Sequence, residues 1–220
     1  MTSYDHFIRL LVLIGFLIGG LLLTTLVSGL LMLASGMSLA DIMKMAQSGM
    51  GALSPGLTRG LLATQHLLIF ILPGLLFGLV FYQGKFLNGL NLDVHPGWQL
   101  SILGIFFLMA AYPLVNLSFL ANESIPLPAW ADKFESQAED TLKAILTMNT
   151  PVIFIFNLII IAILPGIGEE LIFRGILQKH IGLLFKSPVA AIWIAAFIFS
   201  AIHLQFEGFL PRMALGAVLG

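Results

Sequence analysis

Residues 10–34 read LLVLIGFLIGGLLLTTLVSGLLMLA, a run without a single charged side chain. A helix rises 1.5 Å per residue, so this run is long enough to cross a hydrocarbon core of about 30 Å. It is too long for the apolar core of a signal peptide, and only Arg9 precedes it as a positive flank. The sequence therefore predicts a retained membrane-spanning helix at the start of the chain.

Similar apolar runs recur along the rest of the 220 residues. Five runs are long enough to span or nearly span a bilayer, and a sixth begins at residue 210. We place the five at 7–34, 61–83, 98–120, 151–172 and 188–205. The pattern predicts an all-α fold, a polytopic transmembrane helix bundle. Pro73 and Gly74 are expected to kink the second span.

The overall composition supports a membrane protein. Of all residues 59% are hydrophobic and only 10% are charged, whereas a soluble domain carries roughly a quarter charged residues. The net charge of −1 argues against nucleic acid as a partner, because phosphate binding needs a basic surface. The absence of cysteine excludes disulfides, thiolate metal sites and a cysteine nucleophile. We expect a multi-pass integral membrane protein in contact with membrane lipid, in a prokaryotic cell membrane.

One long polar stretch, residues 122–149, interrupts the apolar runs. Apolar side chains recur in it every four residues, and charged side chains occupy the other faces. The apolar set is Trp130, Phe134, Ala138, Leu142 and Leu146. This spacing predicts an amphipathic helix that lies on the membrane surface or caps the bundle. We therefore divide the chain into N-terminal spans with this polar segment, residues 1–149, and a C-terminal part, residues 150–220.

The orientation in the membrane follows from the loops. The loop after residue 178 carries Lys179, His180 and Lys186, whereas the 122–149 segment is net acidic. Basic loops face the cytoplasm. We therefore expect the loop near residue 180 and the N-terminus to lie on the cytoplasmic side.

The stretch EELIFR, Glu169 to Arg174, places three ionisable groups inside an apolar region. Such groups are costly in a membrane and mark a functional site by default. On a helix Glu170 and Arg174 are four residues apart and can pair. Glu169 points about 100° away, and desolvation should raise its pKa towards that of a general base. The alternative is a structural Glu–Arg pair between helices, but a second adjacent glutamate favours a functional site.

Pro165, Gly166 and Gly168 precede the two glutamates. This group should loosen or break the helix just before the carboxylates. Broken backbone at membrane depth lines a wet cavity. Close helix packing through small residues is an equally good reading. We find no internal repeat in the chain.

His203 lies four residues after Phe199, on one helix face of the next apolar run. The helices on either side of the short 181–187 loop must be antiparallel neighbours. Glu169 and His203 lie at similar distances from that loop and therefore at similar membrane depth. We expect them to share one site, where both contact a bound water or a metal. Asn116 and Asn157 are expected to form hydrogen bonds between helices.

These residues resemble the motifs of the CPBP family, the CAAX proteases and bacteriocin-processing enzymes also called the abortive-infection family. Glu169, Glu170 and Arg174 match its Glu-Glu-x-x-x-Arg motif, and Phe199 and His203 match its Phe-x-x-x-His motif. The resemblance covers residues 150–220. It implies an intramembrane endopeptidase in which the glutamates and the histidine activate a water that hydrolyses a peptide or protein substrate. Many members are called metalloproteases, so the cofactor is either a divalent metal, zinc on Glu169 and His203, or none.

The family also carries a later histidine followed after four residues by Asn or Asp, and nothing here matches it. The apolar run from Leu210 ends at Gly220, in the middle of an expected span, so we expect a fragment of a longer product or a degenerate member. Two other functions stay open. The chain could be a non-catalytic immunity or scaffold protein of the same fold, or, with less support, a transporter.

Overall fold

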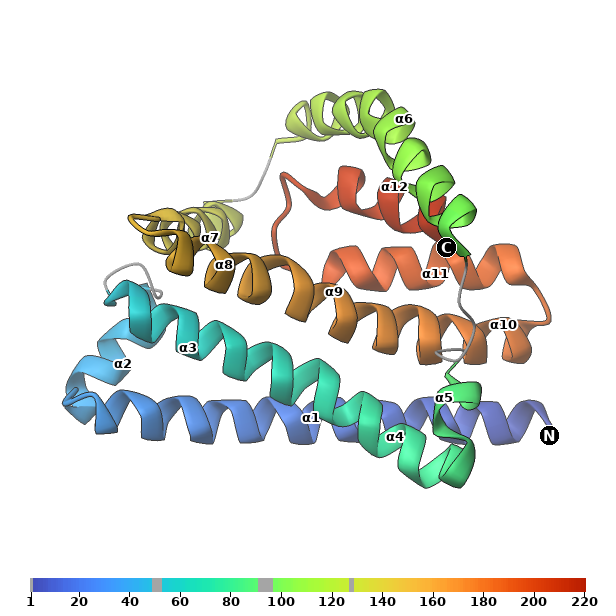
Figure 1. Cartoon of the computed structure of the whole chain (residues 1–220), viewed down its shortest axis with the longest axis horizontal. Helices are drawn as coiled ribbons and strands as arrows, with labels where there is room; N and C mark the ends of the chain where they lie inside the picture. The colour runs from blue at the N-terminus through green and yellow to red at the C-terminus, as the bar shows by residue number, and fades with distance from the viewer. Residues whose placement is uncertain (1, 49–52, 91–96, 127–128) are drawn as a thin grey trace. The chain divides into compact units, whose positions relative to one another are not determined.

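A computed structural model describes residues 2–48, 53–90, 97–126 and 129–220. Figure 1 shows that these residues form helices joined by turns and loops, with no strand among them. Four helical stretches are long and apolar enough to cross a membrane. They are Ser3–Ala34, Pro55–Tyr82, Gly97–Glu123 and Pro151–Phe185. This confirms an all-α polytopic transmembrane bundle.

The fourth span is longer than expected, and the predicted fifth is shorter. The helix that begins at Pro151 does not end at residue 172 but runs on to Phe185. The predicted 181–187 loop is therefore reduced to a turn in which Lys186 has a left-handed backbone, with φ 54°. The run at 188–205 forms only α11 (Pro188–Ala201), whose 14 residues cover about 21 Å. The last run forms α12 (Phe209–Leu219).

The described chain divides into two compact units. Unit 1 contains Met1–Leu10, Gly78–Glu135 and Phe173–Gly220, and unit 2 contains Leu11–Phe77 and Ser136–Ile172. Three spans contribute to both units, namely α1 (Ser3–Ala34), the Pro55–Tyr82 helix and the Pro151–Phe185 helix.

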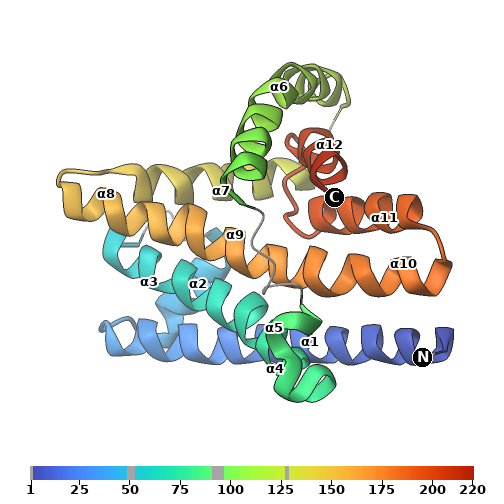
Figure 2. The same cartoon turned by 45° about the vertical axis from the view of Figure 1, so that its right-hand side comes forward.

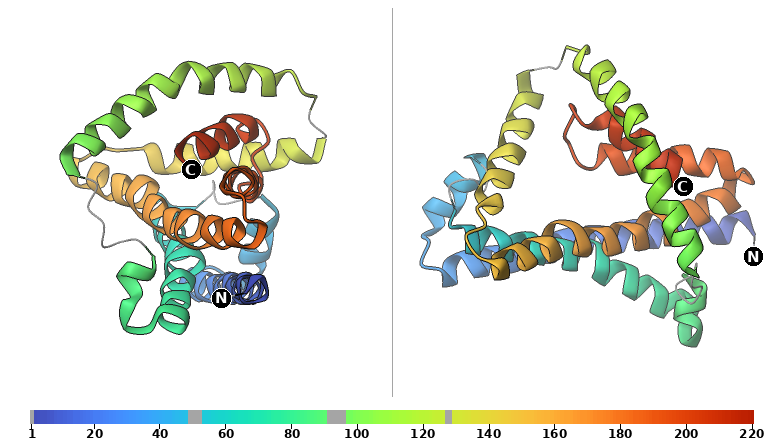
Figure 3. Two further views of the ribbon diagram at one scale, coloured as in Figure 1. Left: turned by 90° about the vertical axis from the view of Figure 1, so that its right-hand side faces the viewer. Right: turned by 45° about the horizontal axis from the view of Figure 1, so that its top comes forward.

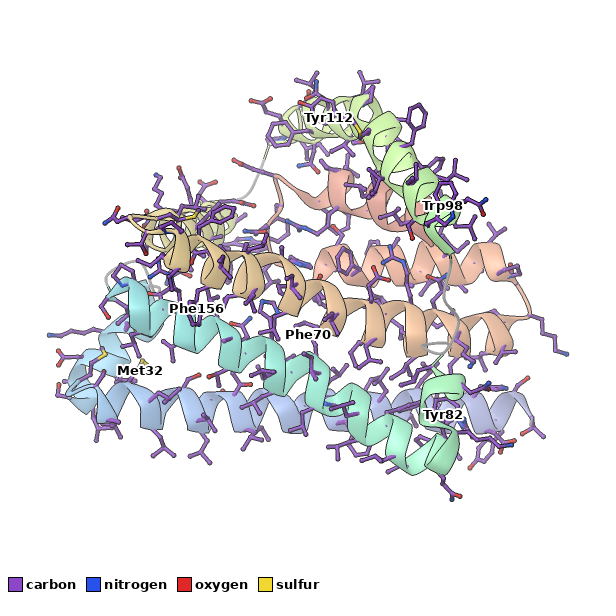
Figure 4. The ribbon with its side chains drawn as sticks, in the orientation of Figure 1. Met32, Phe70, Tyr82, Trp98, Tyr112 and Phe156 are labelled. Atoms are coloured by element: carbon purple, nitrogen blue, oxygen red, sulfur yellow. The ribbon has the colours of Figure 1, made fainter. Side chains whose placement is uncertain are left out.

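Unit 1 is a helical layer around α11. This helix packs against α12 and against α10 (Lys179–Phe185), and α12 packs on α6 (Gly97–Glu123). Figures 1 and 2 both show α11 and α12 side by side, and Figure 3 shows α6 alongside α12. Small residues allow this approach, since a Cβ on Gly216 would lie 3.2 Å from that of Ala196. Trp98 and Tyr112 project from α6 in Figure 4 and are 72% and 70% exposed, as expected for a lipid-facing helix.

Unit 2 packs the second span against the fourth. The second span consists of α3 (Pro55–His66), a π-helical turn η2 (Leu67–Ile71) and α4 (Leu72–Tyr82). The fourth span begins with α8 (Pro151–Leu158), a π-helical turn η4 (Ile159–Ile163) and α9 (Leu164–Glu169). Helix α9 lies against η2 and α3.

These two spans share a short internal repeat that the sequence analysis missed. Ile-Leu-Pro-Gly occurs at 71–74 and again at 163–166. Each copy begins at the last residue of a five-residue π turn. Proline has no N–H to donate to the helical ladder, and a π turn changes the hydrogen-bonding register there. The helix is thus loosened before the glutamates, but it is not broken.

Helix α7 (Ala129–Leu146) is the predicted amphipathic helix. Its polar face carries an exposed Lys143–Glu139 ion pair of 2.7 Å. On its apolar face Trp130 is 57% exposed, which suits a helix at a membrane surface. Helix α2 (Leu39–Ser48) is a second short connector helix, between the first and second spans.

A polar cluster holds the end of α7 in unit 2. Arg59 donates from Nε to Asn157 Oδ1 at 2.7 Å and from Nη2 to the carbonyls of Ile145 and Thr147, at 3.0 and 3.1 Å. Asn157 also donates to the Ile145 carbonyl, at 2.5 Å. These bonds satisfy carbonyls that a helix end leaves open. They confirm the predicted role of Asn157 in joining helices.

Candidate functional site

The two carboxylates lie at a helix junction in unit 2. Glu169 is the last residue of α9, and Glu170 opens the next segment of the same continuous helix. Glu169 is half-buried and Glu170 is exposed, while Leu171 and Ile172 beyond them are buried. The carboxylate expected to act as the base is therefore the more buried of the two.

Close packing fixes the helix just before Glu169. Gly168 is buried, and a Cβ added there would lie 2.9 Å from the Cβ of Phe70 and 3.3 Å from a side-chain carbon of Ile71. Phe70 is labelled on the second span in Figure 4. Leu171, on the other side of the glutamates, contacts Gly74 of the same span. Close packing is thus confirmed for Gly168 but not for Gly166, where no atom lies within 4 Å of an added Cβ. The carboxylates lie between the Gly168 and Gly74 contacts.

The segment that carries Glu170 is a nine-residue π-helix, η5 (Glu170–Gln178). Wide turns of this kind are rare and are frequently found at functional sites. No sequence pattern that we used could have predicted it. Arg174 lies within η5 and is half-buried. The predicted ion pair between Glu170 and Arg174 stays a prediction.

His203 lies in unit 1, two residues beyond α11. Its Nδ1 is 2.7 Å from the carbonyl oxygen of Phe199. A carbonyl only accepts, so Nδ1 carries a proton and donates it. In the neutral ring Nε2 is then the nitrogen with a lone pair, the one that can accept a proton or a water hydrogen. The Phe-x-x-x-His spacing thus sets the tautomer of the histidine.

Aromatic rings link His203 to the helix that bears the glutamates. The Phe199 ring stands edge-on to His203, with centroids 5.0 Å apart, and edge-on to Phe173, at 5.1 Å. Phe173 is the third residue after Glu170. The carboxylates belong to unit 2 and His203 to unit 1, so their meeting in one cavity stays a prediction.

The loop that carries His203 is held by Asn122, a residue that the sequence analysis did not single out. Asn122 is 4% exposed at the end of α6. It donates from Nδ2 to the Phe206 carbonyl at 2.6 Å and accepts from the Leu210 N–H at 3.0 Å. The same loop receives a bond from Ser200 Oγ to the Phe209 carbonyl, at 2.6 Å. An amide at the end of a long apolar run is the one signal that could have identified Asn122.

Metal binding receives no support from the geometry. No group of three or more His, Asp or Glu side chains with a metal-binding arrangement occurs in the described ranges. A catalytic zinc site needs three protein ligands, and the chain has no cysteine to supply one. Glu169 and His203 alone do not complete such a set. No step of the chemistry below is therefore assigned to a metal.

Comparison with known families agrees with the resemblance seen in the sequence. Residues 151–220 match the family model described as type II CAAX prenyl endopeptidase Rce1-like. A search of curated proteins and a search of solved structures each found no match. The matched region contains Glu169, Glu170, Arg174, Phe199 and His203. The match supports assignment to the CPBP/CAAX intramembrane protease family, and with four apolar helices the chain is a multi-pass membrane protein.

Proposed function

We propose that this chain is a CAAX-type intramembrane endopeptidase that uses Glu169 as its general base. Glu169 removes a proton from a water molecule as that water attacks the carbonyl carbon of the scissile peptide bond. The carbonyl oxygen takes the negative charge of the tetrahedral intermediate. Glu169 then returns the proton to the leaving amine nitrogen, and the C–N bond breaks.

His203 acts on the same water in this mechanism. Its Nδ1 proton is committed to the Phe199 carbonyl, so Nε2 accepts a hydrogen bond from the water and orients its lone pair towards the carbonyl carbon. A fixed tautomer of this kind is what a catalytic histidine requires. Glu170 and Arg174 orient Glu169 and keep its helix in place.

The hydrogen bond from His203 to Phe199 is the observation that carries this proposal. It joins the two residues of one motif, and the Phe199 ring in turn contacts Phe173 beside the first motif. The substrate class is a peptide or protein; the description of the matched family suggests a prenylated C-terminus as the first substrate to test.

The test is cleavage of a farnesylated CAAX peptide by the full chain in proteoliposomes, with products identified by mass spectrometry. Glu169→Gln should lower turnover by about 10²–10⁴-fold while leaving insertion and thermal unfolding unchanged. Asp140→Asn is the matched control, since it makes the same carboxylate-to-amide change on the exposed face of α7. Normal turnover by Glu169→Gln would refute the role of Glu169.

A further inference from the structure

A second cluster of titratable side chains lies in unit 1 and contains neither the glutamates nor His203. His6 and His180 approach each other with Nδ1 atoms 3.0 Å apart, and His180 Nε2 lies 3.3 Å from the Tyr82 hydroxyl. His6 is 7% exposed and His180 1%. One ring must donate and the other accept, so the two histidines are not both protonated. This network ties together the start of the first span and the ends of the second and fourth.

Two cations border this network and lie against one aromatic ring. Arg9 is 4.7 Å from the ring centroid of Phe81 and 5.7 Å from that of Tyr82. Lys179 is 5.3 Å from the same Tyr82 centroid and donates to the Gly89 carbonyl at 2.7 Å. Figure 4 labels Tyr82 at the end of the second span. All these partners are neutral, so none of them compensates the two positive charges.

No described carboxylate offsets these charges. Among the described residues, neither Arg9 nor Lys179 forms an ion pair with a carboxylate. By chain connectivity, the start of the first span and the ends of the second and fourth lie at one membrane face. The segments 1–10, 83–96 and 179–188 at this face carry four Lys or Arg residues and only two Asp. This face of the protein is therefore net positive by two charges.

The surroundings of the cluster are those of a membrane interface. Tyr4 and Phe7, on the first turns of α1, are 69% and 48% exposed, and aromatic side chains of this kind settle at the headgroup level. Further along α1, Leu11 and Ile14 are each 51% exposed. A lipid whose acyl chains lie along this surface would bring its headgroup to Arg9 and Lys179.

We propose that Arg9 and Lys179 form a binding site for the phosphate of an anionic phospholipid. The buried His6–His180 pair and Tyr82 hold the two cations at the ends of three spans, and the phosphate compensates their charge. Basic pockets between membrane helices bind anionic headgroups in this way. A metal cation is disfavoured at the histidine pair because Arg9 and Lys179 flank it. This inference does not depend on the proposed protease function.

The test measures lipid selectivity of the full chain in nanodiscs and by native mass spectrometry. Each basic residue near a membrane surface contributes about a fivefold preference for anionic lipid. The wild type should therefore retain phosphatidylglycerol over phosphatidylcholine by roughly 25-fold, and phosphatidylglycerol should raise its Tm. Arg9→Gln/Lys179→Gln should abolish both effects. Equal retention of the two lipids by the wild type would overturn the proposal.

Two controls separate the site from general charge effects. Lys44→Gln/Lys133→Gln removes the same two charges from exposed positions on α2 and α7, and it should keep the lipid preference. Inorganic phosphate added to the detergent-solubilised protein should not reproduce the rise in Tm. An equal rise with phosphate alone would contradict a lipid site. If the double variant does not fold, the wild-type lipid competition still decides, since it requires no substitution.

Discussion

The carboxylate region and the histidine region of the candidate site are held in place by different forces. Around Glu169 the contacts are apolar and close: Gly168 packs against Phe70, and Leu171 packs against Gly74. Around His203, polar bonds dominate, from Asn122 to Phe206 and Leu210 and from Ser200 to Phe209. Both kinds of contact can hold helices together in lipid, where the hydrophobic effect does not drive helices to associate. Close packing and hydrogen bonds between helices stabilise the bundle instead.

This difference predicts different responses to mutation. Packing between glycine and an aromatic side chain tolerates no added volume, because the neighbouring backbone must move. A hydrogen-bonded loop tolerates changes in volume but not the loss of a donor or acceptor, because the orphaned partner remains buried. The position of Glu169 should thus be sensitive to substitutions that add volume next to its helix. The position of His203 should be sensitive to substitutions that remove a hydrogen-bond donor or acceptor from its loop.

The largest effect is expected from His203→Asn. The shorter amide can still donate to the Phe199 carbonyl but offers nothing at the position of Nε2. Turnover should fall by about 10²–10⁴-fold while the Tm stays near that of the wild type. His203→Ala, which removes both nitrogens, should lower the Tm as well. Unchanged turnover in His203→Asn would show that the histidine has only a structural role.

Gly168→Ala tests the packed side of the comparison. The new methyl would lie 2.9 Å from the Phe70 Cβ, which is too close for either backbone to stay in place. We expect a loss of about 1–3 kcal/mol in unfolding free energy and reduced cleavage through displacement of Glu169. Gly166→Ala is the matched control, because no atom lies within 4 Å of a Cβ there. A similar loss in both variants would contradict the packing argument.

Asn122→Ala tests the bonded side. It leaves the Phe206 carbonyl and the Leu210 N–H without their side-chain partner, at a cost of about 1–3 kcal/mol. Asn122→Asp keeps the acceptor for Leu210 but places a carboxylate oxygen against the Phe206 carbonyl at a buried position, so it should lower Tm and turnover at least as much as Asn122→Ala. Contrary to the expectation from sequence, Asn116 is exposed on α6 and takes part in none of the described hydrogen bonds between helices. Asn116→Ala should therefore have no effect. Equal Tm values for Asn122→Ala and Asn116→Ala would rule out a supporting role for Asn122.

The smallest effect should come from weakening the N-terminal cap of α2, which lies outside both regions. Ser38 donates from Oγ to Asp41 Oδ2 at 2.6 Å at the start of α2, and this bond lowers the pKa of Asp41 below its usual value of 3.8. The stabilisation is present above that usual value and is lost as pH falls through the lowered pKa. Asp41→Asn should therefore lower the Tm slightly at pH 7 and not at pH 2. Cleavage at pH 7 should not change.

The spans and the family were predictable from sequence because hydropathy and two short motifs each depend on local pattern. The fourth span was cut short at residue 172, because Arg174, Lys179 and His180 resemble a helix end. In the structure the helix continues to Phe185. Lys179 donates to the Gly89 carbonyl, and His180 pairs with His6. The repeat at 71–74 and 163–166 was visible but overlooked.

Other features of the candidate site could not be read from the chain. Asn122 supports the site through hydrogen bonds to a loop more than 80 residues away in sequence. A single sequence carries no sign of that contact. The π-helical turns depend on the balance between proline, close packing and backbone hydrogen bonds. The mutual pairing of His6 and His180 likewise joins residues 174 positions apart.

The nine-residue π-helix after Glu169 has a consequence for length changes in this family of sequences. A π turn accommodates one more residue than an α turn, so a deletion within 170–178 can be absorbed by a return to regular i→i+4 bonding. The helix would remain continuous, and its two halves would rotate by less than the roughly 100° that a deletion from a regular α-helix causes, because the wide turns already hold the surplus residue. Such a deletion would therefore change the direction of the glutamates less here than in a regular α-helix.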